Sequence, residues 1–323
     1  MATNSTPINS IIIELNPWDL QLLQCTLSRT LDYFLPLAGR LGTTATSDGT
    51  TSFHIICSNT GAEFTHAVAG NVYISELLEP KYLPDAIYSL FPLKEVMNSD
   101  GVSMAVLPPL QQNELDKFVP PTVLRRFFHF SKQTVSELKA KANEEAGMDS
   151  ISSLQAVSAY LWQGVTRARN RKKIKKGCND QEGRDVSFAF HVAMVVQMVC
   201  KEAEILENGL GYAARKINDS VARQSRDTEI KFVQDWVKNP ALVKKIAVPT
   251  FLVGSSPWHN VYGCDFGWGK PVAVGSGMGQ NFDGKMIVYP TPEPGWVDVE
   301  VWLAPETLIA MDEDEEFMEP FMV

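Results

Sequence analysis

The five histidines are the side chains of this chain best suited to general-base chemistry near neutral pH. They are His54, His66, His129, His191 and His259. None of them has an aspartate four residues later, and none lies in a zinc-binding His-Glu-x-x-His segment. The sequence also has no Gly-x-Ser-x-Gly turn for a nucleophilic serine and no phosphate-binding loop that ends in Gly-Lys-Ser or Gly-Lys-Thr. Sequence spacing alone therefore assembles no nucleophile, base and orienting residue.

The five cysteines are widely spaced and form no Cys-x-x-Cys pair. They are Cys25, Cys57, Cys178, Cys200 and Cys264. This spacing disfavours both a disulfide framework and a structural zinc site, so we predict a cytoplasmic protein without a metal. The apolar stretch 188–200 is shorter than the ~20 residues that span a bilayer, and we expect no membrane association.

The net charge of -9, from 29 basic and 38 acidic side chains, disfavours binding to nucleic acids. One basic run, over residues 167–176, departs from this balance. We interpret it as a solvated loop; a nuclear-import signal or an anion site is the alternative. The acidic cluster 312–316 is interpreted in the same way, as a solvated helix start.

Apolar periodicity predicts the elements that must position any site. We expect a strand over 52–57 and a hairpin formed by 285–289 and 297–303. Helices are expected over 27–41, 134–146, 154–169, 210–222 and 228–237. Ser131 or Thr134 would cap the second of these helices, and Ser152 or Ser153 the third. This mixture indicates an α/β protein, and the 323 residues are enough for two domains.

The segment 265–271 reads Asp-Phe-Gly-Trp-Gly-Lys-Pro, with a glycine on each side of Trp268. Such glycines let the backbone turn tightly while a large ring is buried. The segment resembles the Asp-Phe-Gly-Trp-Gly motif of the plant BAHD acyltransferases. Residues 35–41 resemble the Pro-x-x-x-Gly-Arg segment of that family. Further matching stretches follow in the family's order, at 16–20, 91–93, 154–169 and 210–214.

The resemblance implies two CAT-like (CoA-dependent acyltransferase) α/β domains, which we place at 1–118 and 119–323. The family's general base is the histidine of a His-x-x-x-Asp-Gly motif, expected between residues 93 and 125. This chain has no histidine there, so the N-terminal domain would be incomplete. His66, followed by Gly70 in place of the aspartate, is a weak candidate because it precedes the expected position. We interpret His129 and His191 as structural.

Only a few family residues can be carried over. Asp265, Gly267, Trp268 and Gly269 would form the structural motif, with Asp265 paired to Arg167 or Arg169 and Trp268 packed beneath it. A second group matches the family's CoA path: Ser131, Lys132, Ser152, Ser153 and Lys270. A cation or a helix N-terminus there suits an anion, while ordinary helix capping is the other interpretation of the serines.

The resemblance therefore predicts an enzyme class that transfers an acyl group from acyl-CoA to an alcohol or amine of a plant metabolite. Acyl-CoA would be a co-substrate, no cofactor would be bound permanently, and the protein would be a monomer. Without the base, we expect weak or no activity. The alternatives are a non-catalytic CoA- or protein-binding member of the family, or the product of a defective gene model, because other family segments near residues 20–25 and 187–199 also look cut.

Overall fold

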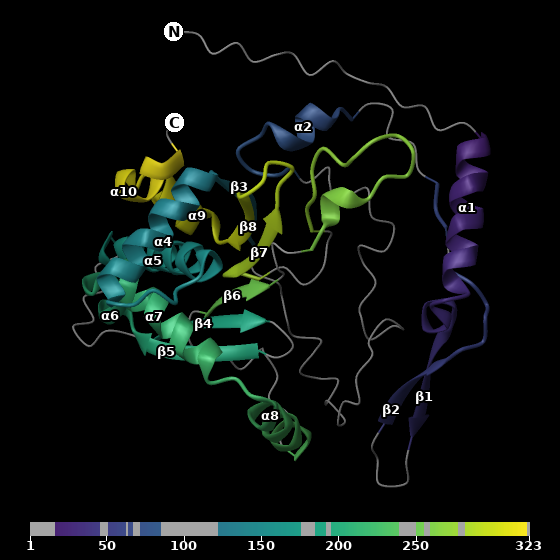
Figure 1. Cartoon of the computed structure of the whole chain (residues 1–323), viewed down its shortest axis with the longest axis horizontal. Coiled ribbons are helices and arrows are strands. Elements are labelled where there is room, and N and C mark those ends of the chain that lie inside the picture. Colours follow the sequence, from purple (N-terminus) through teal and green to yellow (C-terminus); the bar gives the residue numbers. More distant parts are fainter. Residues whose placement is uncertain are drawn as a thin grey trace. The chain divides into compact units, whose positions relative to one another are not determined.

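The computed structural model describes residues 17–45, 51–62, 64–66, 72–84, 122–175, 185–191, 195–238, 250–254, 259–276 and 282–321. The chain forms two compact units (Figure 1). The smaller comprises Met1–Gly70, Glu95–Leu115 and Phe266–Gly269, and the larger comprises Asn71–Lys94, Asp116–Asp265 and Lys270–Val323. The domain boundary at 118/119 stays a prediction.

The larger unit is built on a mixed six-stranded sheet, with strand order β3-β8-β7-β6-β4-β5. Its strands are β3 (Leu124–Phe130), β4 (Asp185–His191), β5 (Val195–Lys201), β6 (Thr250–Gly254), β7 (Lys285–Pro290) and β8 (Val297–Leu303). β6 runs parallel to both of its neighbours, and the other pairs are antiparallel. The predicted hairpin is confirmed, because β7 and β8 pair with Lys285 opposite Trp302.

Helices cover one side of this sheet (Figure 1). They include α4 (Lys132–Ala146), α5 (Ser153–Lys175), α6 (Glu202–Glu207) and α7 (Gly209–Ala222), with α9 (Pro305–Asp312) and α10 (Glu315–Met318) near the C-terminus and α8 (Arg226–Lys238) beyond α7. The capping prediction is confirmed for α4, where the Ser131 hydroxyl accepts a bond from the Thr134 N–H at 3.0 Å and Gly147 ends the helix with a φ of 63°.

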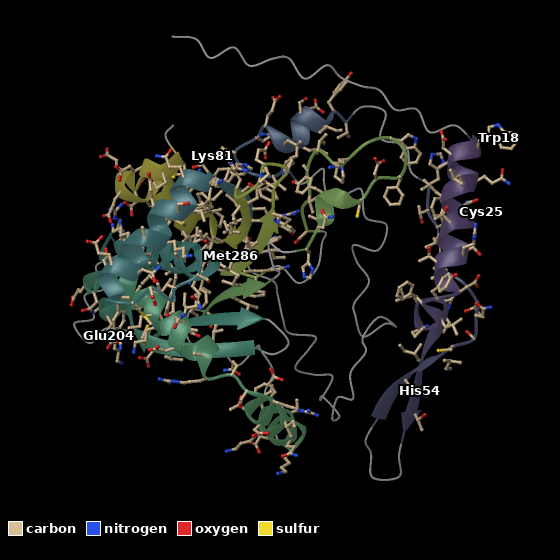
Figure 2. All side chains as sticks on the ribbon, viewed as in Figure 1. Trp18, Cys25, His54, Lys81, Glu204 and Met286 are labelled. Carbon is tan, nitrogen blue, oxygen red and sulfur yellow. The ribbon has the colours of Figure 1, made fainter. Side chains whose placement is uncertain are left out.

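The main core lies between α5 and the sheet. Successive residues of a strand point to opposite faces, so alternate residues of a strand can face α5. Trp162 of α5 packs on Phe188 of β4 with ring centroids 5.1 Å apart, and both are almost fully buried. Met286, marked on β7 in Figure 2, and Val301 of β8 are fully buried in the same cluster. Residues 188–191 and 195–200 of the apolar stretch belong to the antiparallel pair of β4 and β5.

The smaller unit contains α1 (Pro17–Leu31), a short 3-10 helix at Leu35–Ala38 and the antiparallel strands β1 (Arg40–Ala45) and β2 (Thr51–Ile56). The strand prediction over 52–57 is confirmed. The helix prediction over 27–41 is wrong in its bounds, since α1 begins ten residues earlier and Arg40 already belongs to β1. Pro17 opens the first turn of α1, where a missing N–H costs nothing.

The structure of this unit explains why Gly39 and Arg40 occur together. A Cβ added to Gly39 would lie 2.5 Å from the carbonyl oxygen of Ile56, so only glycine fits against β2. Arg40 donates from Nη1 to the carbonyl oxygens of Gly39 and Gly61, each at 2.8 Å. The arginine thereby ties the start of β1 to the turn that follows β2.

The basic run is the end of helix α5 and not the loop that its composition predicts. Arg167 contacts Asp314 at 3.3 Å and Glu316 at 2.7 Å, and Arg169 contacts Asp283 at 3.0 Å. Acidic partners from the C-terminal third neutralise these cations. This segment therefore packs as a helix, although its composition is typical of a solvated loop. The side chains of residues 172–176 lie outside the described part.

The acidic cluster is a helix start, as predicted. Glu313, Glu315 and Glu316 are exposed, as the solvated interpretation requires, but Asp312 and Asp314 are not. Asp314 caps α10 and is 1% exposed, and it also meets Arg171 at 3.4 Å. Asp312 contacts Lys81 and Tyr82, each at 2.6 Å, and pairs with Arg126. Buried carboxylates are stable only when cations and donors surround them, and here both acids hold the C-terminal helices to the rest of the unit.

A second buried charge lies on the face of the sheet away from α5. Glu300 of β8 is fully buried and accepts hydrogen bonds from Arg125 of β3, the N–H of Ser276 and the hydroxyl of Tyr289. Arg125 also donates to the Ser276 carbonyl oxygen at 2.7 Å. Glu300 thus joins three strands and fastens the segment that ends at Ser276 to them.

We predict that Gly164→Ala lowers the free energy of unfolding by about 1–3 kcal/mol, because overpacking strains a filled core. The added Cβ would lie 2.5 Å from the Phe317 ring, which cannot retreat because it also packs edge-on against Phe128. Guanidinium denaturation followed by far-UV circular dichroism measures the change. Ser136→Ala on the exposed face of α4 is the control and should alter stability little. Equal stability of both variants would contradict the packing of α5 on the C-terminal segment.

Glu300→Gln should destabilise the larger unit by about 3–5 kcal/mol, since it leaves the Arg125 cation in a buried place without its carboxylate. The matched control is Glu137→Gln on exposed α4, for which a change below about 0.5 kcal/mol is expected. The same denaturation experiment compares the two variants. A Glu300 variant as stable as its control would show that the buried pair does not hold the sheet together.

Candidate functional site

The Asp-Phe-Gly-Trp-Gly loop needs both of its glycines. Gly267 and Gly269 have φ values of 100° and 104°, a backbone region that other residues rarely adopt. The expected burial of the tryptophan ring is wrong, because Trp268 is 36% exposed. A Cβ added at either glycine would meet nothing within 4 Å, so the positive φ, and not crowding, is what requires glycine at these positions. Phe266 is the aromatic neighbour of Trp268, with ring centroids 6.5 Å apart.

The arginines proposed as partners of Asp265 are both engaged with other acids. Arg167 holds Asp314 and Glu316, and Arg169 holds Asp283, as described above. Asp265 is an exposed residue of the larger unit. A pairing of Asp265 with Arg167 or Arg169 therefore stays a prediction, as does the packing of Trp268 beneath it.

Ser131 and Lys132 lie at the junction between β3 and α4. The Ser131 hydroxyl caps the helix, and Lys132 is exposed. The methylene groups of Lys132 lie beside the turn between β7 and β8, because a Cβ added at Gly295 would be 3.0 Å from Lys132 Cγ. The first turn of α4 has no acidic side chain, so its N–H groups and Lys132 together suit an anion.

Ser152 and Ser153 lie at the start of α5. The Ser152 N–H donates to the side-chain oxygen of Gln155 at 2.8 Å, while the Ser152 hydroxyl accepts from the Gln155 N–H at 3.3 Å. This reciprocal capping confirms Ser152 as the helix cap. Ser153 is the first residue of the helix, whose first turn also has no acidic side chain. A contact with CoA stays a prediction for both serines.

The two remaining candidate site residues, Lys270 and His66, lie far from these helix starts in the sequence. Lys270 is exposed and directly follows the Gly269 turn. His66 is also exposed, but residues 67–70 of its segment lie outside the described part. Residues 85–121, where the resemblance places the missing base, lie outside it too. The structure therefore leaves the role of His66 as a prediction.

His129 has a partner that sequence analysis did not find. It lies on β3, as the strand interpretation requires, and its Nδ1 is 2.7 Å from Asp298 Oδ1 on β8. The hydrogen bond to Asp298 raises the pKa of His129 above the usual 6.5. The two residues are 169 positions apart, so no local motif could join them. The only sequence signal is the alternation of residues along each strand, which would place His129 and Asp298 on the same face once β3 and β8 pair.

The buried network beside this pair was also missed by sequence analysis. Arg125 and Lys285 lie over the Trp302 ring, 5.2 Å and 4.4 Å from its centroid. Burial lowers the pKa of Lys285 and raises that of Tyr289. This face of β3, β8 and β7 therefore brings together titratable side chains from three strands.

Two further features were searched within the described ranges. No group of three or more histidine, cysteine, aspartate or glutamate side chains is placed to hold a metal ion there. No helix in that part of the chain has both the length and the apolar character needed to cross a membrane.

Comparison with known proteins identifies the family. The model of the Transferase family matches residues 14–108 and 189–318. An uncharacterised acetyltransferase of Arabidopsis thaliana is 28% identical over 382 aligned positions, which cover 92% of this chain and 86% of the relative. The BAHD acyltransferase DCR of the same plant is 27% identical, and its alignment covers 62% of this chain and 44% of DCR. The first alignment is longer than this chain of 323 residues, so it contains internal gaps.

The solved structures agree on the fold. F. graminearum TRI101 complexed with coenzyme A and T-2 mycotoxin superposes with a TM-score of 0.69 over 94% of this chain and 91% of TRI101, at 15% sequence identity. At this identity the likeness shows the fold, and it confirms the predicted CAT-like α/β class. With the family model covering more than half of the residues, the chain belongs to the BAHD family of acyltransferases.

Proposed function

We propose that this chain binds acyl-CoA and transfers its acyl group to an alcohol or amine only slowly, or not at all. The observation behind this proposal is that none of the five histidines has an aspartate four residues later. Removal of a general base typically lowers a rate ~10²- to 10⁴-fold. Family membership supports the reaction class, and the missing motif supports the low rate.

The CoA site in this proposal uses the starts of helices α4 and α5. Both are capped by serines, Ser131 and Ser152, and both first turns are free of acidic side chains. Lys132 adds a cation at the first of them, and Ser153 continues the second. Lys270 after the motif loop completes the path. Phosphates bind well where helix N–H groups and a lysine converge.

The remaining features of the proposal rest on the family. TRI101 was crystallised with coenzyme A, which supports acyl-CoA as the co-substrate of this chain. We expect no permanently bound cofactor. A small alcohol or amine of plant metabolism would be the acceptor. We expect a cytoplasmic monomer that binds neither nucleic acids nor membranes, in keeping with its net charge of -9.

The rate is tested by following the release of CoA thiol from a panel of acyl-CoAs in the presence of alcohols and amines. We expect an acceptor-dependent rate at least ~10²-fold below that of an intact family member assayed beside it, because no His-x-x-x-Asp base is available. His66→Ala should leave this rate unchanged. Rapid transfer that His66→Ala abolishes would overturn the proposal and identify His66 as the base.

Binding is tested by calorimetry with CoA. Lys132→Ala should weaken binding about 2- to 5-fold, because each exposed lysine near a phosphate contributes about 1 kcal/mol or less. The control is Lys141→Ala, an exposed lysine on the same helix that pairs with Glu145. Binding of the parent protein without turnover would favour the non-catalytic member of the family. No detectable binding by the parent protein would overturn the CoA site.

A further inference from the structure

The described residues contain one histidine whose ring is held by a carboxylate from another strand. His129 and Asp298 are directly opposite each other in the antiparallel pairing of β3 and β8. Their contact, from Nδ1 to Oδ1, measures 2.7 Å. Since both residues lie within a hydrogen-bonded ladder, their separation is set by the sheet and not by flexible loops. A histidine that acts as a base needs this kind of orienting partner on its second nitrogen.

The other nitrogen of the ring is open to solvent. The His129 side chain is 63% exposed, and within the described ranges no residue hydrogen bonds to Nε2. The Phe127 ring stacks on the imidazole with centroids 6.2 Å apart and 15° between the planes. The carboxylate and the stacked ring together fix the tautomer and the plane, so that a lone pair on Nε2 points toward water.

Other charged and titratable groups surround the pair. Tyr289 of β7 is opposite Asp298, and Tyr262 and Glu293 lie in the loops near that carboxylate. Arg126 on β3 opposes protonation of His129, but the hydrogen bond to Asp298 has the larger effect. The pKa of His129 is therefore raised above the usual 6.5, and the neutral ring predominates only above that raised pKa.

The pair also lies beside the proposed CoA path. His129 precedes the Ser131 cap by two residues, and Lys132 begins α4. Asp298 follows the turn that contains Gly295, against which Lys132 packs. The β3–α4 junction and the β7–β8 turn thus bring the base, its carboxylate and the lysine to one end of the sheet.

We propose that His129, oriented by Asp298, is a general base for the hydrolysis of acyl-CoA by this chain. Nε2 takes a proton from water as the water oxygen bonds to the thioester carbonyl carbon. The C–S bond then breaks, and the departing CoA sulfur takes the proton from the imidazolium. The products are a carboxylic acid and CoA thiol. Water is the acceptor because the imidazole is exposed. This activity rests on the proposed CoA site and adds a reaction to it.

The experiment follows thiol release from acetyl-CoA and a longer acyl-CoA in buffer without any alcohol or amine. We expect slow release above the rate in buffer alone, and His129→Gln should reduce it to the buffer rate. The control is His259→Gln, another exposed histidine, which should leave the rate unchanged. Circular dichroism verifies folding, and His129→Asn provides a second variant.

The pH profile separates a base from a merely structural residue. Since the neutral ring is the active form, the rate should fall as pH drops through the raised pKa of His129. Asp298→Asn replaces the carboxylate with a neutral amide, which stabilises the protonated ring less, so the pKa of His129 falls and the inflection should move to lower pH. A structural role would not move it.

Three results would overturn the proposal. The first is a parent protein that binds CoA but releases no thiol above buffer, which would leave the CoA site intact. The second is release that persists in His129→Gln, and the third is an inflection that Asp298→Asn does not move. A parent protein that does not bind CoA at all would overturn the proposed function itself.

Discussion

The face of the sheet that carries the candidate chemistry depends on one buried carboxylate. Glu300 receives hydrogen bonds from Arg125, Ser276 and Tyr289, which come from β3, the segment before β7, and β7. A carboxylate removed from water is tolerated only when donors fill its lone pairs and a cation balances it. Glu300 meets both conditions, and its donors are therefore held in one arrangement. His129 and Asp298 lie further along β3 and β8, the strands that Arg125 and Glu300 join, and that arrangement fixes the spacing between them.

The same rule organises the C-terminal end of the larger unit. Asp312 and Asp314 are largely buried, and each is balanced by arginines, Arg126 for the first and Arg167 and Arg171 for the second. These pairs connect α9 and α10 to β3 and α5. Charges that composition would assign to solvent are thus part of the packing. The aromatic contacts of Phe317 with Phe128 and Tyr160 fill the space between them.

Binding and proton transfer are separable properties in a chain of this kind. The groups proposed to hold CoA are helix starts and lysines, and they do not depend on the segment where the family places its base. In the proposed function, the loss of that segment would remove the base and leave the anion-binding groups in place. A histidine on the sheet, held by its own carboxylate, would then be the group able to move a proton.

The family could be inferred from the sequence because its motifs are local. The glycines on each side of Trp268 form a short pattern that their own positive φ values require. The Gly39-Arg40 pair is equally short in the sequence, although Ile56 of β2 is what requires its glycine. The helix caps at Ser131 and Ser152 and the β7–β8 hairpin were predictable for the same reason. Local propensity and turn chemistry act over a few residues, so the sequence shows them directly.

The helical packing of the basic run and the burial of Asp312 and Asp314 were decided by tertiary structure. Each depends on partners far along the chain, as Arg167 does on Asp314. The candidate site follows this pattern as well: residue types and the family came from the sequence, whereas the meeting of His129 with Asp298 required the pairing of β3 with β8. A strand's neighbour is set by the packing of the whole sheet, and no spacing within a single segment determines it.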